Sequence, residues 1–126
     1  MSAEKSVATQ EFIERDFRFG ARNYAPLPVV LERGEGVYVW DVEGKRYFDM
    51  LSAYSAVNQG HCHPRIVQAA KEQLDRLCLT SRAFHNNVMG DFLEKICRMT
   101  GFEKALPMNS GAEGVETAIK AMRRWG

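Results

Sequence analysis

A helix start near the end of the chain is the feature that most constrains its fold. Ser110 is a typical N-cap residue, and Glu113 three positions later completes a capping box. The apolar residues beyond this cap recur at the spacing of one helical face: Ala112, Val115, Ala118, Ile119, Met122 and Trp125. Residues 104–108 precede it as a short apolar run, which we expect to be a strand with an irregular end at Pro107. A strand followed by a crossover helix predicts part of an α/β fold with parallel strands.

The turn that opens this helix is also a candidate anion site. The first N–H groups of a helix lack internal partners, and the helix dipole places positive charge there. Ser110, Gly111 and Ala112 are therefore candidate phosphate-binding residues, because a glycine lets an anion approach the backbone closely. An ordinary capped helix is the alternative. Neither standard nucleotide fingerprint occurs in the sequence, so a phosphate here would belong to another kind of cofactor.

Composition and charge restrict the class of partner. The 126 residues include 17 basic and 16 acidic side chains, and the formal net charge of +1 gives no basic surface for nucleic acid or anionic membrane. A small molecule is the expected partner. No apolar run is long enough to span a membrane, and the first residues lack the apolar block of a signal peptide. The three cysteines form no Cys-x-x-Cys pair, which favours a reducing, cytoplasmic location.

Local patterns predict a helix, a small sheet and two further helices before residue 104. Thr9 is expected to cap the first helix, and Gly20 to end it, around an apolar stripe of Phe12, Ile13 and Phe17. Residues 29–32, 37–40 and 46–49 are β-branched and aromatic runs separated by turn residues, which predicts an antiparallel meander. Apolar residues at helical spacing then predict two helices, and the positions that carry the pattern are Ile66, Ala70, Leu74 and Leu77, followed by Val88, Phe92, Ile96 and Met99. Gly101 is expected to end the second of these.

The run His61-Cys62-His63-Pro64 contains metal-ligand side chains, but its spacing argues against a metal site. Alternate residues rarely converge on one ion without a second pair of ligands, and His85 is the only other histidine. We expect Pro64 to be the first residue of a helix and the two histidines to be loop or cap residues. No metal is predicted.

Two isolated tyrosines stand in irregular segments. Tyr24 lies next to Pro26 and Pro28, which exclude a regular helix or a central strand. A tyrosine on a stiff loop is well placed to face a pocket, although the segment is equally a simple connection. Tyr54 lies in residues 52–60, which show no convincing period.

Three stretches of the sequence, residues 19–28, 47–64 and 106–117, closely resemble the ornithine aminotransferase family. This family belongs to the class III aminotransferases, which bind pyridoxal 5′-phosphate on a fold type I scaffold. The resemblance implies an α/β amino-terminal portion of that fold. Residues 1–60 would form the N-terminal segment and the small-domain meander, and residues 61–126 the start of the large cofactor-binding domain.

The resemblance also implies functions for individual residues. The cofactor phosphate would be held by main-chain groups at Ser110, Gly111 and Ala112. Tyr24 would contact the α-amino end of the substrate, and Tyr54 would line the same pocket and help to select ornithine over related ω-amino substrates. The implied reaction moves the δ-amino group of ornithine to 2-oxoglutarate, giving glutamate 5-semialdehyde and glutamate, in a homodimer or a higher homo-oligomer.

The sequence departs from the family pattern in its lysines. None of the six lysines matches the family's cofactor-binding lysine, which the resemblance places beyond residue 126. No catalytic residue is therefore assigned, and the isolated chain is expected to be inactive. Three alternatives stay open: a class III relative acting on acetylornithine or 4-aminobutyrate, a non-catalytic binding module, and a split enzyme whose remainder is a separate chain.

Overall fold

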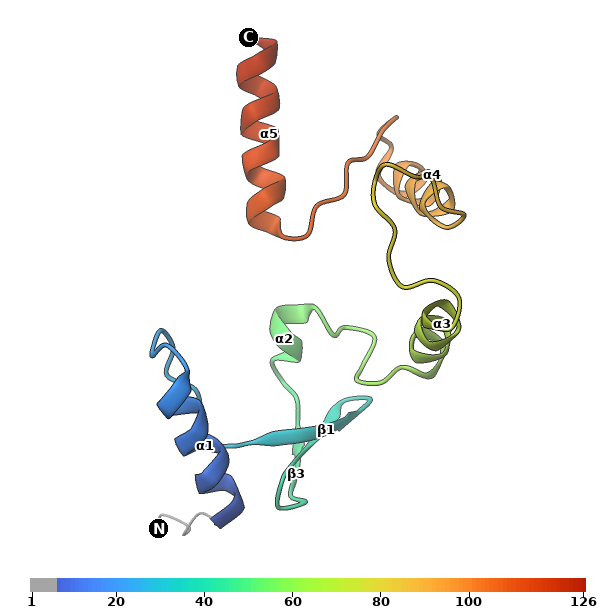
Figure 1. The fold of residues 1–126 in the computed structure, drawn as a ribbon. Coiled ribbons are helices and arrows are strands. Elements are labelled where there is room, and N and C mark those ends of the chain that lie inside the picture. The colour runs from blue at the N-terminus through green and yellow to red at the C-terminus, as the bar shows by residue number, and fades with distance from the viewer. Residues whose placement is uncertain (1–6) are drawn as a thin grey trace. The chain divides into compact units, whose positions relative to one another are not determined.

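The computed structural model describes residues 7–126, which fall into two compact units that we describe separately. The first unit ends at Cys78, and the second comprises Leu79–Gly126. Figure 1 shows the order of the elements along the chain. The first unit contains α1 (Val7–Phe19), β1 (Leu31–Glu35), β2 (Tyr38–Asp41), β3 (Arg46–Phe48), α2 (Ser52–Ser55) and α3 (Pro64–Leu74), and the second contains α4 (Met89–Thr100) and α5 (Gly111–Trp125).

The predicted antiparallel meander is confirmed, with shifted strand ends. The strands lie in the order β1-β2-β3, and both neighbouring pairs are antiparallel. Gly34 and Glu35 were predicted as turn residues, but they belong to β1 and pair with Val39 and Tyr38. The chain reverses at Gly36 instead, because its φ of 57° is a conformation that glycine adopts without strain.

Aromatic contacts hold the small sheet together around its one buried apolar residue, Val39. The ring of Tyr38 lies 4.8 Å from that of Phe48 and 6.2 Å from that of Trp40, measured between centroids. The Arg33 guanidinium lies 3.5 Å above the Trp40 ring, a distance typical of a cation–π contact. Three strands with one aromatic face are close to the smallest sheet that is stable in water.

The first helix begins earlier than the capping pattern predicted. It starts at Val7, so Thr9 lies inside its first turn and the prediction of Thr9 as the N-cap is wrong. The Thr9 side chain is buried and donates a hydrogen bond of 2.6 Å to a carboxylate oxygen of Glu43, in the β2–β3 connection. Thr9, which was predicted to cap the helix, thus joins α1 to the β2–β3 connection of the sheet. Gly20 does follow the helix, as predicted, and its N–H donates to the carbonyl of Asp16.

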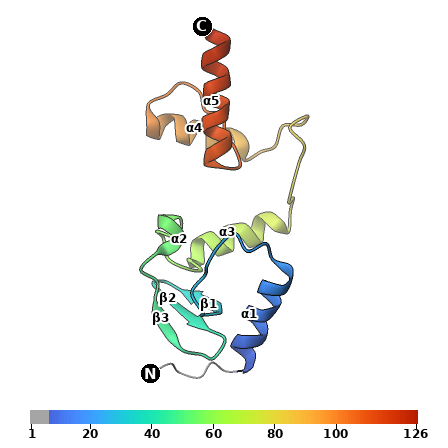
Figure 2. The same ribbon diagram turned by 90° about the vertical axis from the view of Figure 1, so that its left-hand side faces the viewer.

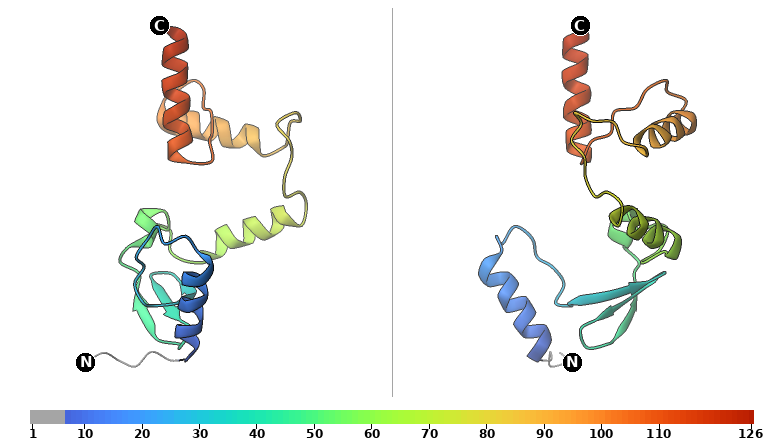
Figure 3. Two further views of the ribbon diagram at one scale, coloured as in Figure 1. Left: turned by 60° about the vertical axis from the view of Figure 1, so that its left-hand side comes forward. Right: turned by 45° about the vertical axis from the view of Figure 1, so that its right-hand side comes forward.

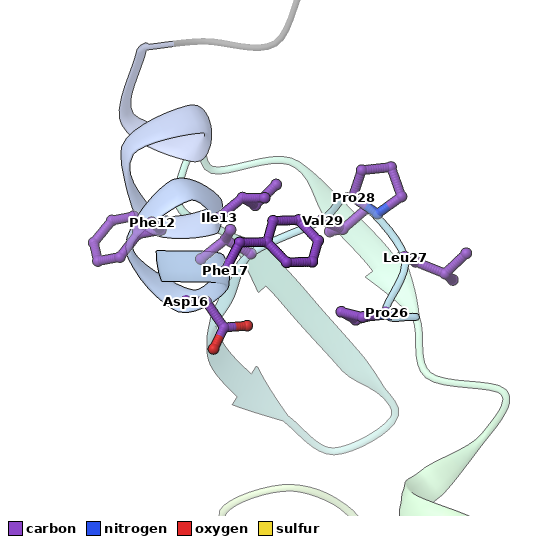
Figure 4. Close-up of a pocket in the computed structure, with 9 residues that line it drawn as sticks. Phe12, Ile13, Asp16, Phe17, Pro26, Leu27, Pro28 and Val29 are labelled. Carbon is purple, nitrogen blue, oxygen red and sulfur yellow. The ribbon is translucent and has the colours of Figure 1, made fainter. Parts of the chain in front are cut away.

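Helix α1 lies beside the proline-rich segment that leads into β1 (Figure 2), and Phe12 of its apolar stripe points away from that segment (Figure 4). Ile13 and Phe17 lie on the side of the helix that is turned toward Val29 in Figure 4. Together the two segments enclose an apolar pocket of about 530 Å³, lined by Phe12, Ile13, Asp16, Phe17, Pro26, Leu27, Pro28, Val29 and Val30. Residues 20–30 form no helix or strand, which agrees with the connection predicted around Pro26 and Pro28, but the strand predicted from residue 29 begins only at Leu31.

Both amphipathic helices of the middle region are confirmed. Pro64 is the first residue of α3, where its missing N–H costs nothing and its fixed φ suits the helix. α4 ends at Thr100, and Gly101 follows it with a φ of 77°, the left-handed cap that stops a helix. Leu77 lies three residues beyond the end of α3.

The second unit lacks the strand predicted before α5. Residues 104–108 pair with no other segment of the described chain, so the predicted strand is not formed here. A parallel strand needs a neighbour, and within residues 7–126 the elements in contact are only β1 with β2 and β2 with β3. Both views in Figure 3 show residues 101–110 as a long connection between α4 and α5. In residues 7–126 we find no helix with the length and apolar character needed to cross a membrane.

Candidate cofactor and substrate site

Tyr54 lies on a helical turn of the opposite hand to an ordinary helix. Within α2, Ala53 (φ 48°, ψ 51°) and Tyr54 (φ 56°, ψ 44°) are left-handed, and Ser52 and Ser55 also have positive φ. Residues with a Cβ atom pay roughly 1–2 kcal/mol each for this conformation. Four such residues in succession persist only where surrounding contacts hold them.

Asp49 supplies the contacts at the start of this turn. Its Oδ1 atom accepts hydrogen bonds from the backbone N–H groups of Leu51 (3.1 Å) and Ser52 (2.8 Å). Its Oδ2 atom lies 2.7 Å from Nε2 of His61, which must be the donor because a carboxylate only accepts. The N–H of Ser52, followed by His61, holds the pKa of Asp49 below its ordinary value. Asp49 therefore joins the start of the turn to a residue that lies twelve positions later.

His61 is itself fixed to the sheet. Its N–H donates to the carbonyl of Gly36 over 2.8 Å, and the Gly36 N–H donates back over 3.0 Å. The His61 side chain lies against Gly34, where an added Cβ would come within 2.7 Å of the imidazole Cγ. Only a glycine at position 34 leaves room for this ring. The β1–β2 turn thus holds His61, and His61 holds Asp49.

The two tyrosines predicted to bind substrate are brought together. The phenol oxygens of Tyr24 and Tyr54 lie 3.0 Å apart, although the residues are 30 positions apart in the chain. Both rings are exposed, at 70% for Tyr24 and 76% for Tyr54, so their hydroxyl groups remain open to a ligand. The hydrogen bond with Tyr24 raises the pKa of the Tyr54 phenol, which stays neutral at physiological pH. A neutral phenol pair can both donate and accept hydrogen bonds.

The capping box predicted at α5 is confirmed. Ser110 has the extended backbone of an N-cap, and its Oγ accepts from the N–H of Glu113 over 3.3 Å. A carboxylate oxygen of Glu113 accepts from the N–H groups of Ser110 (3.1 Å) and Asn109 (2.8 Å). These bonds leave the N–H groups of Gly111 and Ala112 without an acceptor among the described residues.

The open N–H groups at this turn fit a phosphate. A Cβ placed on Gly111 would meet no atom within 4 Å, so the backbone there is accessible to a bulky anion. The N–H groups of Gly111 and Ala112 belong to the first turn of α5, where the helix dipole favours negative charge. A pocket of about 450 Å³ reaches the same turn at Asn109 and has Arg82 among its lining residues. The tyrosine pair belongs to the first unit and this turn to the second.

Two residues of the tyrosine site escaped sequence reasoning. His61 was predicted only as a loop or cap residue, and Asp49 only as the last residue of a strand, whereas together they hold the turn that carries Tyr54. An aspartate followed three residues later by serine is a common turn signal and could have marked Asp49. His61 had no comparable signal. Within residues 7–126 no group of three or more histidine, cysteine or acidic side chains is arranged to hold a metal ion.

Comparison with known proteins identifies the family. The family model described as aminotransferase class III matches residues 19–126. This chain belongs to the class III aminotransferases. The predicted fold type I scaffold is thereby confirmed, and so is pyridoxal 5′-phosphate as the cofactor of the class.

Individual class III proteins show the same resemblance. The ornithine aminotransferase of a Geobacillus species is 64% identical over 93% of this chain and 29% of that protein. The mitochondrial ornithine aminotransferase of Rattus norvegicus is 58% identical over 98% of this chain and 28% of that protein. The crystal structure of an acetylornithine aminotransferase from Elizabethkingia anophelis is 63% identical, with a TM-score of 0.89 over 93% of this chain and 30% of its own. This class III chain therefore spans less than a third of the length of these relatives.

Proposed function

We propose that the full-length protein with this sequence transfers the δ-amino group of ornithine to 2-oxoglutarate, giving glutamate 5-semialdehyde and glutamate. The observation that carries the proposal is the contact of 3.0 Å between the phenols of Tyr24 and Tyr54. Resemblance assigns these two residues to the substrate pocket, and the structure brings them together on exposed segments. The identity with proteins named ornithine aminotransferase supports the same substrate.

The residues of this chain would bind and orient rather than react. The bound cofactor would supply the carbonyl group that accepts and returns the nitrogen. At the start of α5, the N–H groups of Gly111 and Ala112 would donate to its phosphate. The N–H of Ser110, which was predicted to bind the phosphate too, donates to Glu113 in the capping box, so Ser110 would instead hold the turn in place. The phenol oxygens of Tyr24 and Tyr54 would accept hydrogen bonds from the α-ammonium group of ornithine, which directs the δ-amine toward the reaction. We assign no catalytic residue in this chain and propose that the isolated chain is inactive.

The first alternative substrate is acetylornithine. It is favoured by the similarity to the Elizabethkingia anophelis structure, which is described as an acetylornithine aminotransferase. Acetylornithine carries a neutral amide in place of the α-ammonium group, so it presents a single N–H donor and no charge to the tyrosine pair. Hydrogen bonds to a charged group are roughly twice as strong as neutral ones, so an exposed phenol pair favours ornithine. 4-Aminobutyrate lacks an α-amino group altogether and would leave the pair unused.

The test compares kcat/KM of the full-length protein for ornithine, acetylornithine and 4-aminobutyrate, each with 2-oxoglutarate. We expect the highest value for ornithine. Replacing Tyr54 with isoleucine should lower the preference for ornithine over the other two amines. A higher value for acetylornithine would overturn the substrate assignment. Absence of turnover with every ω-amine, in protein that binds the cofactor, would favour a non-catalytic module, whereas co-purification of a second chain that restores turnover would favour a split enzyme.

We also propose that the full-length protein is a homodimer or a higher homo-oligomer. The support is the resemblance described above, which implies a dimer or a higher oligomer for this family. Analytical ultracentrifugation of the full-length protein tests this directly.

A cytoplasmic location is proposed from the three cysteines, which are all unpaired. The division into a small-domain part (residues 1–60) and a large-domain part (residues 61–126) likewise remains a proposal.

A further inference from the structure

We propose that Asp49 and His61 are positioning residues for substrate discrimination: they hold the left-handed turn α2 so that the phenol of Tyr54 meets that of Tyr24. This inference rests on the proposed function, because it takes the tyrosine pair as the part of the site that recognises the α-amino end of ornithine. Neither Asp49 nor His61 is expected to touch the substrate.

The segment that carries Tyr54 is closed at its two ends. Residues 49–61 leave β3 and return to the β1–β2 turn, where the N–H and carbonyl groups of His61 pair with those of Gly36. The contact of 2.7 Å between Asp49 Oδ2 and His61 Nε2 closes the loop between its two ends. The position of Tyr54 within this loop therefore depends on that closure.

The turn that carries Tyr54 has the hand that L-amino acids disfavour. Ala53 and Tyr54 adopt a conformation that residues with a Cβ avoid, and no glycine lies between Asp49 and Tyr54 to ease it. Asp49 Oδ1 accepts from the N–H groups of Leu51 and Ser52, at the point where the residues with positive φ begin. Strain of this kind persists when neighbouring contacts fix the backbone, and these are such contacts.

Both oxygens of the Asp49 carboxylate accept hydrogen bonds. One oxygen serves the backbone of the turn and the other serves His61. An asparagine offers a single, uncharged acceptor oxygen, so Asp49→Asn loses the charge-assisted bond from the His61 N–H, and His61 keeps a contact only as the other tautomer, accepting from the asparagine NH2. Replacing His61 with alanine removes only the link to the sheet, and replacing it with glutamine keeps an N–H donor on a side chain of similar length.

The test separates positioning from general stability through a ratio. The full-length holoenzyme is assayed with ornithine and with 5-aminopentanoate, which keeps the δ-amine and the carboxylate but lacks the α-amino group. The ratio of the two kcat/KM values reports recognition of the α-amino end alone. A variant that only unfolds part of the protein lowers both kcat/KM values together and leaves the ratio unchanged.

We expect Tyr54→Phe to lower the ratio about tenfold, the loss typical of one hydrogen bond to a charged group. Asp49→Asn and His61→Ala should lower it by a similar factor, and His61→Gln should restore most of it. In the double variant of Tyr54→Phe with His61→Ala the ratio should fall no further than in Tyr54→Phe alone, because both changes remove the same interaction. Glu72→Gln is the control: Glu72 lies on α3, accepts a hydrogen bond from Gln68, and should leave the ratio unchanged.

The possible failures are distinguishable. If Tyr54→Phe leaves the ratio unchanged, the assignment of the tyrosine pair in the proposed function is wrong and this inference falls with it. If Tyr54→Phe lowers the ratio while Asp49→Asn and His61→Ala do not, the proposed function stands and the positioning inference is overturned. Additive effects in the double variant would overturn it as well. Should His61→Ala not fold, Asp49→Asn and the pairing of Tyr54→Phe with Asp49→Asn carry the same comparison.

Discussion

The phenol of Tyr47 donates a hydrogen bond of 2.6 Å to the carboxylate of Asp41, at the end of β2. The same carboxylate accepts from the backbone N–H groups of Glu43 (3.0 Å) and Lys45 (2.9 Å), which lie in the turn between β2 and β3. Asp41 is buried, and its side chain thus orders this turn from within. Because Glu43 accepts the hydrogen bond from Thr9, the turn also anchors α1.

The Tyr47–Asp41 pair predicts a stability change at alkaline pH. The hydrogen bond to Asp41 raises the pKa of Tyr47 from 10.0 to about 12. A raised pKa in the folded state means that the contribution to stability is complete below pH 10.0 and is lost as the pH approaches about 12. We expect Tyr47→Phe to unfold at lower denaturant concentration than the parent at pH 8, with a difference that shrinks between these two pH values. A difference that stays constant over this range would contradict the prediction.

A second prediction concerns acid. The N–H of Ser52, and then His61, hold the pKa of Asp49 below 3.8. A lowered pKa means that stability from this carboxylate is present above pH 3.8 and is lost as the pH falls through the lower value of the folded state. Asp49→Asn should therefore be less stable than the parent at neutral pH, and the two denaturation midpoints should converge in strong acid. A difference between the two midpoints that stays the same at every pH would show that the charge of the Asp49 carboxylate does not contribute to stability.

A third prediction tests the space beside His61. The added Cβ of Gly34→Ala would lie 2.7 Å from Cγ and 2.9 Å from Nδ1 of the imidazole, so the ring must shift. We expect a loss of about 1–3 kcal/mol in the free energy of unfolding, the usual cost of overpacking. Gly90→Ala is the matched control, since a Cβ there meets nothing within 4 Å. Equal melting temperatures for the two variants would show that the contact at Gly34 is readily relieved.

A fourth prediction tests the phosphate turn. Gly111→Ala adds a methyl group where nothing lies within 4 Å, and the capping bonds of Ser110 do not involve this position, so stability should be unchanged. The methyl group would occupy space next to the open N–H groups. We expect the dissociation constant of the full-length protein for pyridoxal 5′-phosphate to rise about tenfold, in line with the loss of one charge-assisted hydrogen bond.

The control for the phosphate turn is Gly114→Ala, in the second turn of α5. A Cβ at this position also meets nothing within 4 Å. The substitution should leave the affinity for the cofactor unchanged. If Gly111→Ala binds the cofactor as tightly as this control, the phosphate is not held at Gly111.

Local signals predicted the helices well, and contacts distant in sequence explain the errors. The cap of α5 and the end of α4 depend on Ser110, Glu113 and Gly101, which act within a few residues of themselves, so the sequence alone located both. Threonine is a common N-cap residue, but the side chain of Thr9 donates its hydrogen bond to Glu43, 34 positions away. The strand predicted at residues 104–108 is not formed because a strand also depends on a distant partner, and residues 7–126 do not supply one.

In the candidate site too, the contacts between residues distant in sequence could not be predicted from local signals. Tyr24 and Tyr54 were predicted as site residues through resemblance alone, because nothing in their spacing indicates that their hydroxyl groups meet. Asp49 and His61 were missed because their contact crosses twelve positions and fixes a turn whose hand carries no sequence mark. Neither Ala53 nor Tyr54 is a residue type that indicates positive φ.

The left-handed conformation of α2 also predicts which part of the first unit should unfold locally first. Opening a segment with an unfavourable backbone conformation relieves its strain, which lowers the free-energy cost of opening. Opening the paired strands breaks hydrogen bonds and relieves no such strain. Amide hydrogens of residues 55–57 should thus exchange with solvent well before those of β2. Such an opening would separate the phenol of Tyr54 from that of Tyr24 while the sheet stays intact, so the pair can part and re-form without global unfolding.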